Sequence, residues 1–107
     1  GRSVCVVNMR TLAPIDEPLL HVILGGKGAI VTVEDHLPSG GLFSIVAECM
    51  ARWGVARPIL PINLATWFRP ALLPSVLAHE GLTGESIAER ILFALVTSDS
   101  LEVAHVD

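Results

Sequence analysis

Residues 31–42 constrain the fold more than any other part of the sequence. An apolar run ends in three polar residues and a Pro-Ser-Gly-Gly turn, which leads into a helix-period pattern. This order predicts a strand, a loop and a helix. In open α/β sheets, ligands gather beyond the carboxyl ends of strands, where the next helix presents unpaired N–H groups and its positive dipole end. The sequence therefore places a candidate crevice at Glu34, Asp35, His36, Ser39, Gly40 and Gly41.

Three apolar runs predict strands. Residues 3–7 form a short β-branched run, and residues 28–33 are continuously apolar, which is typical of a strand covered on both faces in a parallel sheet. Residues 57–63 predict a third strand, although Pro58 and Pro61 remove two ladder donors and favour an edge position.

Helix signals alternate with these runs. Asp16 is a predicted cap for a first helix, and apolar residues recur at helical spacing from Gly41 to Trp53. Residues 72–79 predict a third helix and Thr83 caps a fourth, while residues 96–107 are expected to be a tail. We expect one domain over residues 1–107, in the α/β class, with three α/β/α layers and a mostly parallel sheet.

Composition and charge exclude several classes of partner. The formal net charge is −4 and the seven basic residues are scattered, so the sequence lacks the footprint of a nucleic-acid-binding protein. No apolar segment approaches the roughly 20 residues that span a bilayer, and the first residues lack signal-peptide order, so we expect a cytoplasmic protein. Cys5 and Cys49 are predicted to be buried thiols. No spacing of histidines and cysteines indicates a metal site.

The apolar content points to a covered surface. Hydrophobic residues make up 51% of the chain and the mean hydropathy is +0.61, more than a lone soluble domain needs. Three strands alone would also leave rows of backbone groups unpaired. Either another chain completes the sheet or part of the natural domain is absent, and we expect an oligomer.

Three segments resemble the carboxyl-terminal domain of the transketolase-like enzymes, a family that includes transketolase, deoxyxylulose phosphate synthase and the beta subunits of 2-oxoacid dehydrogenases. They are Cys5–Asp16, Ile30–His36 followed by Gly40-Gly41-Leu42, and Gly81-Leu82-Thr83 with Glu85, Ile87, Ala88, Glu89 and Ile91. Their order and spacing agree from about residue 3 to 95. The Glu-Asp-His variant looks most like transketolases proper.

The resemblance implies transfer of a two-carbon ketol unit between sugar phosphates, with thiamine diphosphate and a divalent metal, Mg. In that family the cofactor lies between two upstream domains, which this chain does not contain. We therefore expect no catalytic residue and no bound cofactor here, and a role in supporting assembly and dimerisation. The same resemblance implies that the domain lacks its first strand and helix. We expect the chain to be either a fragment of a longer product or one subunit of a split enzyme whose upstream domains are on another polypeptide.

The sequence departs from the family at two places. Phe43 follows Gly-Gly-Leu, where the family usually has a small residue. Trp67, Phe68 and Arg69 replace most of a family loop, in which only Phe68 clearly corresponds. Aromatic and arginine side chains dominate interface hot spots, so these three residues are a candidate interface, with core packing as the alternative.

Two readings of the crevice compete. Glu34, Asp35 and His36 could supply acid/base or metal chemistry, but adjacent strand residues diverge, which favours a structural role. Ser39, Gly40 and Gly41 could cradle an anion at the helix N-terminus or could cap the helix and allow tight packing. The alternative function is accordingly a stand-alone binding or docking module that uses the crevice Glu34–Gly41 for an anionic ligand or a partner protein.

Overall fold

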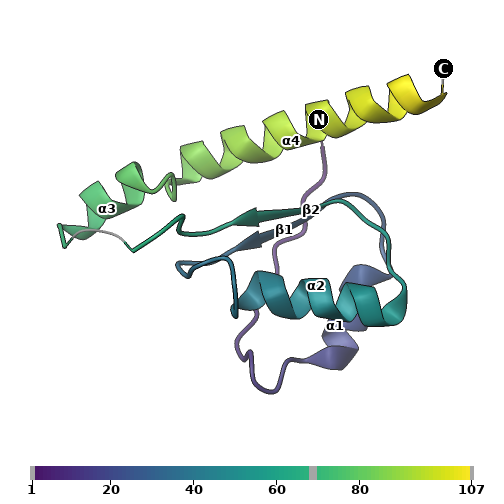
Figure 1. The fold of residues 1–107 in the computed structure, drawn as a ribbon, viewed down its shortest axis with the longest axis horizontal. Helices are drawn as coiled ribbons and strands as arrows, with labels where there is room; N and C mark the ends of the chain where they lie inside the picture. Colours follow the sequence, from purple (N-terminus) through teal and green to yellow (C-terminus); the bar gives the residue numbers. More distant parts are fainter. Residues whose placement is uncertain (1, 68–69, 107) are drawn as a thin grey trace.

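Helices and strands alternate along most of the chain. The computed structural model describes the backbone of residues 2–67 and 70–106, and side chains within these ranges as far as residue 97. The elements are α1 (Glu17–Leu24), β1 (Ile30–Val33), α2 (Leu42–Trp53), β2 (Ile59–Ile62), α3 (Leu73–His79) and α4 (Gly84–Val106). In Figure 1, α1 and α2 lie on one face of the sheet and α4 lies across the other. The predicted α/β class is confirmed.

The sheet is parallel, as the continuous apolar run predicts. Within the described residues it has two strands, with Ile30 opposite Ile59 and Val33 opposite Ile62. Pairing continues past the strand ends, because the N–H of Leu64 donates to the carbonyl oxygen of His36 at 2.9 Å. The two strands therefore enter the predicted crevice side by side.

The main core lies between the sheet and the α1–α2 layer. Its buried members are Leu20, Leu24, Ile30, Val46, Cys49 and Met50. The rings of His21 and Trp53 stack with centroids 3.6 Å apart, which joins α1 to α2. Local caps also form as predicted: Asp16 Oδ1 accepts from the N–H of Leu19, and Thr83 Oγ1 accepts from the N–H of Ser86.

The prediction of a strand at residues 3–7 was wrong. The segment is not assigned to a strand, and Val4 and Val6 are 81% and 88% exposed. Cys5 is exposed, contrary to the prediction of a buried thiol, whereas Cys49 is buried. A β-branched run favours extended backbone, but a strand exists only where a neighbour accepts its hydrogen bonds. Here Val4 instead borders a hollow beside α4, with Ala88 and Leu92.

The last helix is longer than the sequence pattern suggested. Backbone of the expected tail, residues 96–107, continues as α4 to Val106. Neither glycine nor proline occurs between residues 85 and 106, so no strong stop signal ends the helix earlier. None of the helices described here has the length and apolar character of a membrane span.

The molecule exposes more surface than a compact domain of its size. Its accessible surface area is 7922 Å², whereas a compact protein of 11.4 kDa exposes about 5,800 Å². The Cα radius of gyration is 15.2 Å, against about 13 Å for a compact chain of similar length. Figure 1 shows α4 extending along the long axis of the molecule.

Arg57, two residues before β2, ties this part of the chain to the end of α1 and the loop before β1. Its guanidinium group donates to the carbonyl oxygens of Ile23 at 2.6 Å, Lys27 at 2.9 Å and Gly28 at 3.0 Å. The first of these carbonyls lies in the last turn of α1, where a cation is favourable. The planar guanidinium group carries several N–H donors and can donate to three carbonyl oxygens at once. The ammonium group of a lysine cannot do so in the same geometry.

We predict that Arg57→Lys lowers the free energy of unfolding by about 1–3 kcal/mol, because charge-assisted hydrogen bonds to carbonyls are lost. Arg90→Lys is the matched control, since Arg90 has one long contact of 3.5 Å to the Pro61 carbonyl. Urea unfolding followed by circular dichroism measures both variants. Equal stability of the two variants would contradict the role given to Arg57.

Candidate functional site

Glu34 forms the centre of the candidate crevice. It follows the last residue of β1, and its half-buried side chain turns toward the start of α2. The N–H of Leu42 donates to Oε2 at 2.7 Å and the N–H of Phe43 donates to Oε1 at 3.1 Å. Both oxygens thus accept unpaired N–H groups at the positive end of a helix, where a negative charge is stabilising.

Gly41 is needed because the Glu34 carboxylate occupies the space beside it. A Cβ at residue 41 would overlap Glu34 Oε2 and would lie 2.9 Å from Cδ. The backbone of Gly41 is extended, at φ −101°, so any residue could adopt it. Gly40 differs: its φ is +87°, and an added Cβ would meet no atom within 4 Å. Space therefore selects glycine at residue 41, and backbone conformation selects it at residue 40.

Ser44 closes the turn from inside the helix. Its hydroxyl accepts from the N–H of Gly40 at 2.8 Å and donates to the carbonyl oxygen of Pro38 at 3.2 Å. Ser39, which the sequence placed in the crevice, is exposed. The turn is therefore held by the chain's own groups.

Asp35 and His36 do not join Glu34 in a common group. Both are exposed, and His36 Nδ1 lies 2.7 Å from the carbonyl oxygen of Leu37, a distance that fits donation by that nitrogen. In the part of the chain that the structure describes, no three histidine, cysteine, aspartate or glutamate side chains gather as a metal site. The geometry favours the structural interpretation of the triplet over acid/base or metal chemistry.

The same geometry bears on anion binding. An external anion at the start of α2 would need the N–H groups of Leu42 and Phe43, and Glu34 already accepts both. A carboxylate supplied by the chain thus occupies the place of a ligand anion. This favours capping and tight packing as the role of the Gly-Gly turn.

The candidate interface is only partly described. The Trp67 side chain is 80% exposed, so packing in the core does not account for it. Phe68 and Arg69 lie outside the described residues. Phe43, the departure from the family pattern, is half-buried in the first turn of α2, and its N–H contributes to the Glu34 contact.

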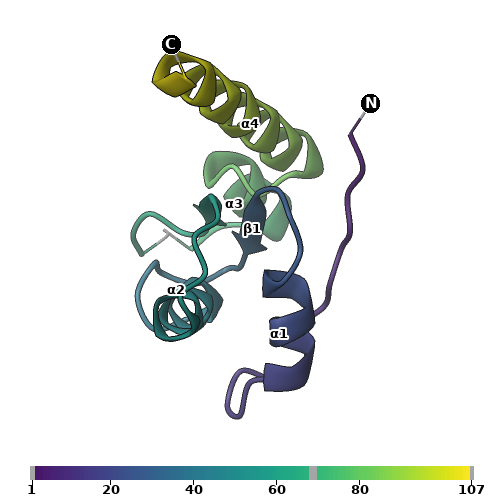
Figure 2. The same ribbon diagram turned by 90° about the vertical axis from the view of Figure 1, so that its right-hand side faces the viewer.

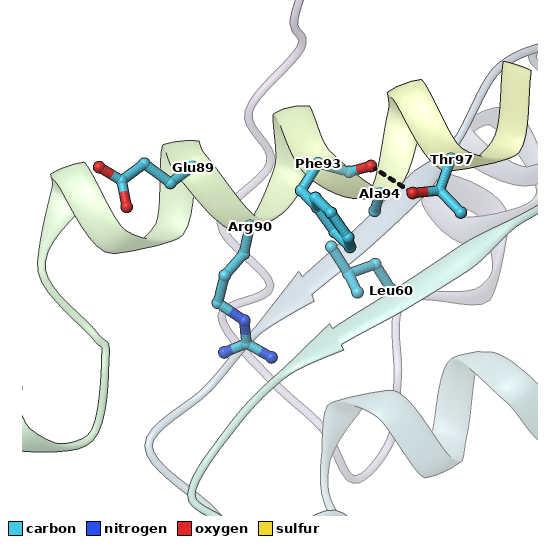
Figure 3. A pocket seen from close by; sticks show the side chains of 6 residues that line it. All are labelled: Leu60, Glu89, Arg90, Phe93, Ala94 and Thr97. Atoms are coloured by element: carbon cyan, nitrogen blue, oxygen red, sulfur yellow. Dashed lines mark hydrogen bonds between the residues drawn. The ribbon is translucent and has the colours of Figure 1, made fainter. Parts of the chain in front are cut away.

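Two hollows beside α4 lie away from residues 34–41. A hollow of about 700 Å³ runs between α4 and β2 (Figure 3). The Phe93 ring points toward Leu60 there, and Arg90 extends toward the strands. Its polar lining is the Glu89 carboxylate, the Arg90 guanidinium group and the Thr97 hydroxyl, which donates to the Phe93 carbonyl oxygen at 2.9 Å. The remainder of the lining is apolar.

Sequence reasoning missed the roles of Ser44 and Arg57. A serine in the first turn of a predicted helix is a recognised signal of side-chain contact with nearby backbone, and this signal could have identified Ser44. Arg57 had no comparable signal, because its acceptors lie 29 to 34 residues away along the chain.

We expect Gly41→Ala to lower the free energy of unfolding by about 1–3 kcal/mol, because the added methyl group must displace the Glu34 carboxylate from the α2 N–H groups. Gly84→Ala is the control, since a Cβ there meets no atom within 4 Å. Chemical unfolding should show a change within about 0.5 kcal/mol for that variant. A Gly41→Ala protein as stable as the Gly84→Ala protein would refute the steric account.

Comparison with known proteins agrees with this architecture. Residues 1–87 match the family described as "Transketolase, C-terminal domain". A Methanocaldococcus jannaschii protein named "Putative transketolase C-terminal section" is 42% identical over 93 residues, which cover 86% of this chain and 28% of that protein.

Two relatives are named 1-deoxy-D-xylulose-5-phosphate synthase. That of Stutzerimonas stutzeri is 42% identical over 83 residues, covering 77% of this chain and 13% of the relative. That of Thermomicrobium roseum is 34% identical over 107 residues, covering 99% of this chain and 17% of the relative. The chain thus spans less than a third of the length of each relative. By sequence and by fold, it belongs to the transketolase C-terminal domain family.

Proposed function

We propose that the chain is the carboxyl-terminal, non-catalytic part of a thiamine-diphosphate-dependent transketolase-like enzyme of the cytoplasm. The enzyme would transfer a ketol unit between sugar phosphates. Thiamine diphosphate and Mg²⁺ would be held by upstream domains, on the same or another polypeptide. The role of this chain would be to stabilise the assembly and its dimer.

The surplus of exposed surface carries this proposal. The accessible area exceeds that of a compact protein of this mass by about 2,100 Å², whereas each partner of a standard interface buries about 800 Å². Large apolar side chains contribute to it. Those at least two-thirds exposed are Val4, Val6, Val22, Trp67, Leu72, Leu73 and Phe93. An exposed apolar surface of this size is suited to pack against other domains.

The contacts made by residues of the crevice favour a structural role of the chain over a chemical one. Glu34, its best-placed carboxylate, is committed to the backbone of α2, and Ser44 is committed to the turn. A general acid or base must reach a proton of the substrate, and a group held by two backbone N–H groups is poorly placed to do so. The residues whose side chains hold the turn are thus the ones that would otherwise be candidates for chemistry.

We predict that the 107-residue chain alone neither binds thiamine diphosphate with Mg²⁺ in calorimetry nor transfers ketol units between sugar phosphates. Mixing it with the upstream transketolase-like polypeptides of its source should restore transfer, because the cofactor would then be bound between their domains. An upstream preparation without this chain is the control. Ketol transfer by the isolated chain would overturn the proposal.

Trp67 tests the interface directly. We expect Trp67→Ala to weaken binding to the upstream polypeptides about 30-fold, as buried aromatic anchors do. Its own free energy of unfolding should change by less than about 0.5 kcal/mol, because the side chain is exposed. Glu48→Ala, at an exposed polar position of α2 outside the apolar surface, is the control. Unchanged binding, or a large loss of stability, would show that Trp67 is not an interface anchor.

A further inference from the structure

The contact between the rings of His21 and Trp53 lies where α1 meets α2, outside the crevice of residues 34–41. Figure 2 shows the two helices as neighbours on the same side of β1. His21 lies in the last turn of α1 and Trp53 is the last residue of α2. Their ring centroids are 3.6 Å apart and their planes differ by 18°, so the rings lie face to face. His21 is exposed, whereas Trp53 is half-buried against the core, so water reaches the imidazole ring of the pair.

Protonation of His21 changes what this contact contributes. A neutral imidazole ring only stacks on the indole, whereas an imidazolium ring also places a positive charge over the indole face. Tryptophan attracts a cation more strongly than the other aromatic side chains do, within about 6 Å of the ring centroid. The separation of 3.6 Å is well inside that range. The last turn of α1 favours a positive charge as well, because the negative end of the helix dipole lies there.

Charged groups of α1 and α2 bear on the same ring. Glu17 precedes His21 by one turn of α1, at the spacing at which a carboxylate supports a cation. Arg52 of α2 would repel an imidazolium ring. Its guanidinium group, however, donates to Cys49 Sγ at 3.1 Å, and the carboxylates of Glu17 and Glu48 attract it. Two carboxylates therefore offset the one cation that α2 brings to this place.

Two further cations belong to the segments after α1 and before β2. Arg57 directs its guanidinium group to three backbone carbonyl oxygens at the end of α1 and in the loop before β1. Lys27 lies in that loop and is exposed, so water and salt screen its charge. Both cations act on His21 from outside the stack, whereas the indole face touches the imidazole ring directly. The ring contact therefore decides the effect of protonation.

We propose that His21 and Trp53 form a pH-sensitive joint between α1 and α2, which protonation of His21 tightens. At about pH 8 stacking alone holds the joint, and at about pH 5.5 the attraction of the imidazolium ring is added. The unfolded chain lacks this contact, so the added stability is gained as the pH falls through the histidine range and is lost as the pH rises. Because α1 supplies Leu20 and Leu24 to the core, the joint controls how firmly that helix is held.

Urea unfolding of the full chain at about pH 8 and about pH 5.5 tests the joint. His21→Phe keeps an aromatic ring against Trp53 but cannot take up a proton. Between the two pH values, the folding equilibrium constant of the unaltered chain should rise about fivefold more than that of His21→Phe. His79→Gln is the matched control, because His79 also lies in the last turn of a helix, α3, and the described residues give it no ring contact. This variant should keep the pH response of the unaltered chain.

Equal pH responses of the unaltered chain and His21→Phe would overturn the proposal. So would a loss of the response in His79→Gln as large as that in His21→Phe, because helix ends in general would then account for it.

Tryptophan emission provides a second readout that needs no unfolding. In a Trp67→Phe background, Trp53 is the sole tryptophan. An imidazolium ring in contact with an indole quenches its emission, so the emission should fall as the pH falls from about 8 to about 5.5. Adding His21→Phe should remove this change. A Trp53 emission that does not depend on pH while His21 is in place would contradict the joint.

Discussion

The remainder of the structure depends on the contact between the Glu34 carboxylate and the first N–H groups of α2. Glu34 also donates its own N–H to the carbonyl of Ile62, so one residue joins the sheet to the helix that covers it. The contact requires a glycine at residue 41, and the turn that follows requires Ser44. A strand end, a turn and a helix start are thus fixed by charge and by space together.

Local features of the fold were predictable from the sequence, and long-range side-chain contacts were not. Asp16 and Thr83 cap helices as their positions predicted, because a cap involves residues only three apart. The candidate site at residues 34–41 was identified in the sequence for a similar reason, since apolar, polar and Gly-Gly segments follow one another. The sequence favoured a structural role for Glu34, but the partners of its side chain were not predicted, because they are backbone groups eight and nine residues ahead. Residues 3–7 show the opposite error: their β-branched pattern was evident, but pairing depends on a neighbour that no local pattern specifies.

The crevice and the exposed surface support the same proposal. Where α/β proteins commonly bind ligands, this chain uses its own carboxylate and hydroxyl groups to hold its backbone. Where a free-standing domain would be closed, it exposes Trp67, Leu72 and Phe93. Family membership alone does not assign a role to a chain that matches only a section of its longer relatives. A turn held by the chain's own groups, together with exposed apolar side chains, suits a section that supports an assembly.

A double-mutant cycle between Glu34 and Gly41 tests the central contact most directly. The free energy of unfolding is measured by urea titration for the unaltered chain, Glu34→Ala, Gly41→Ala and the double variant. If the carboxylate beside residue 41 makes glycine necessary, Gly41→Ala should cost at least about 1 kcal/mol less when Glu34 is already alanine. Costs that simply add would show that the two residues act independently, which would contradict the account.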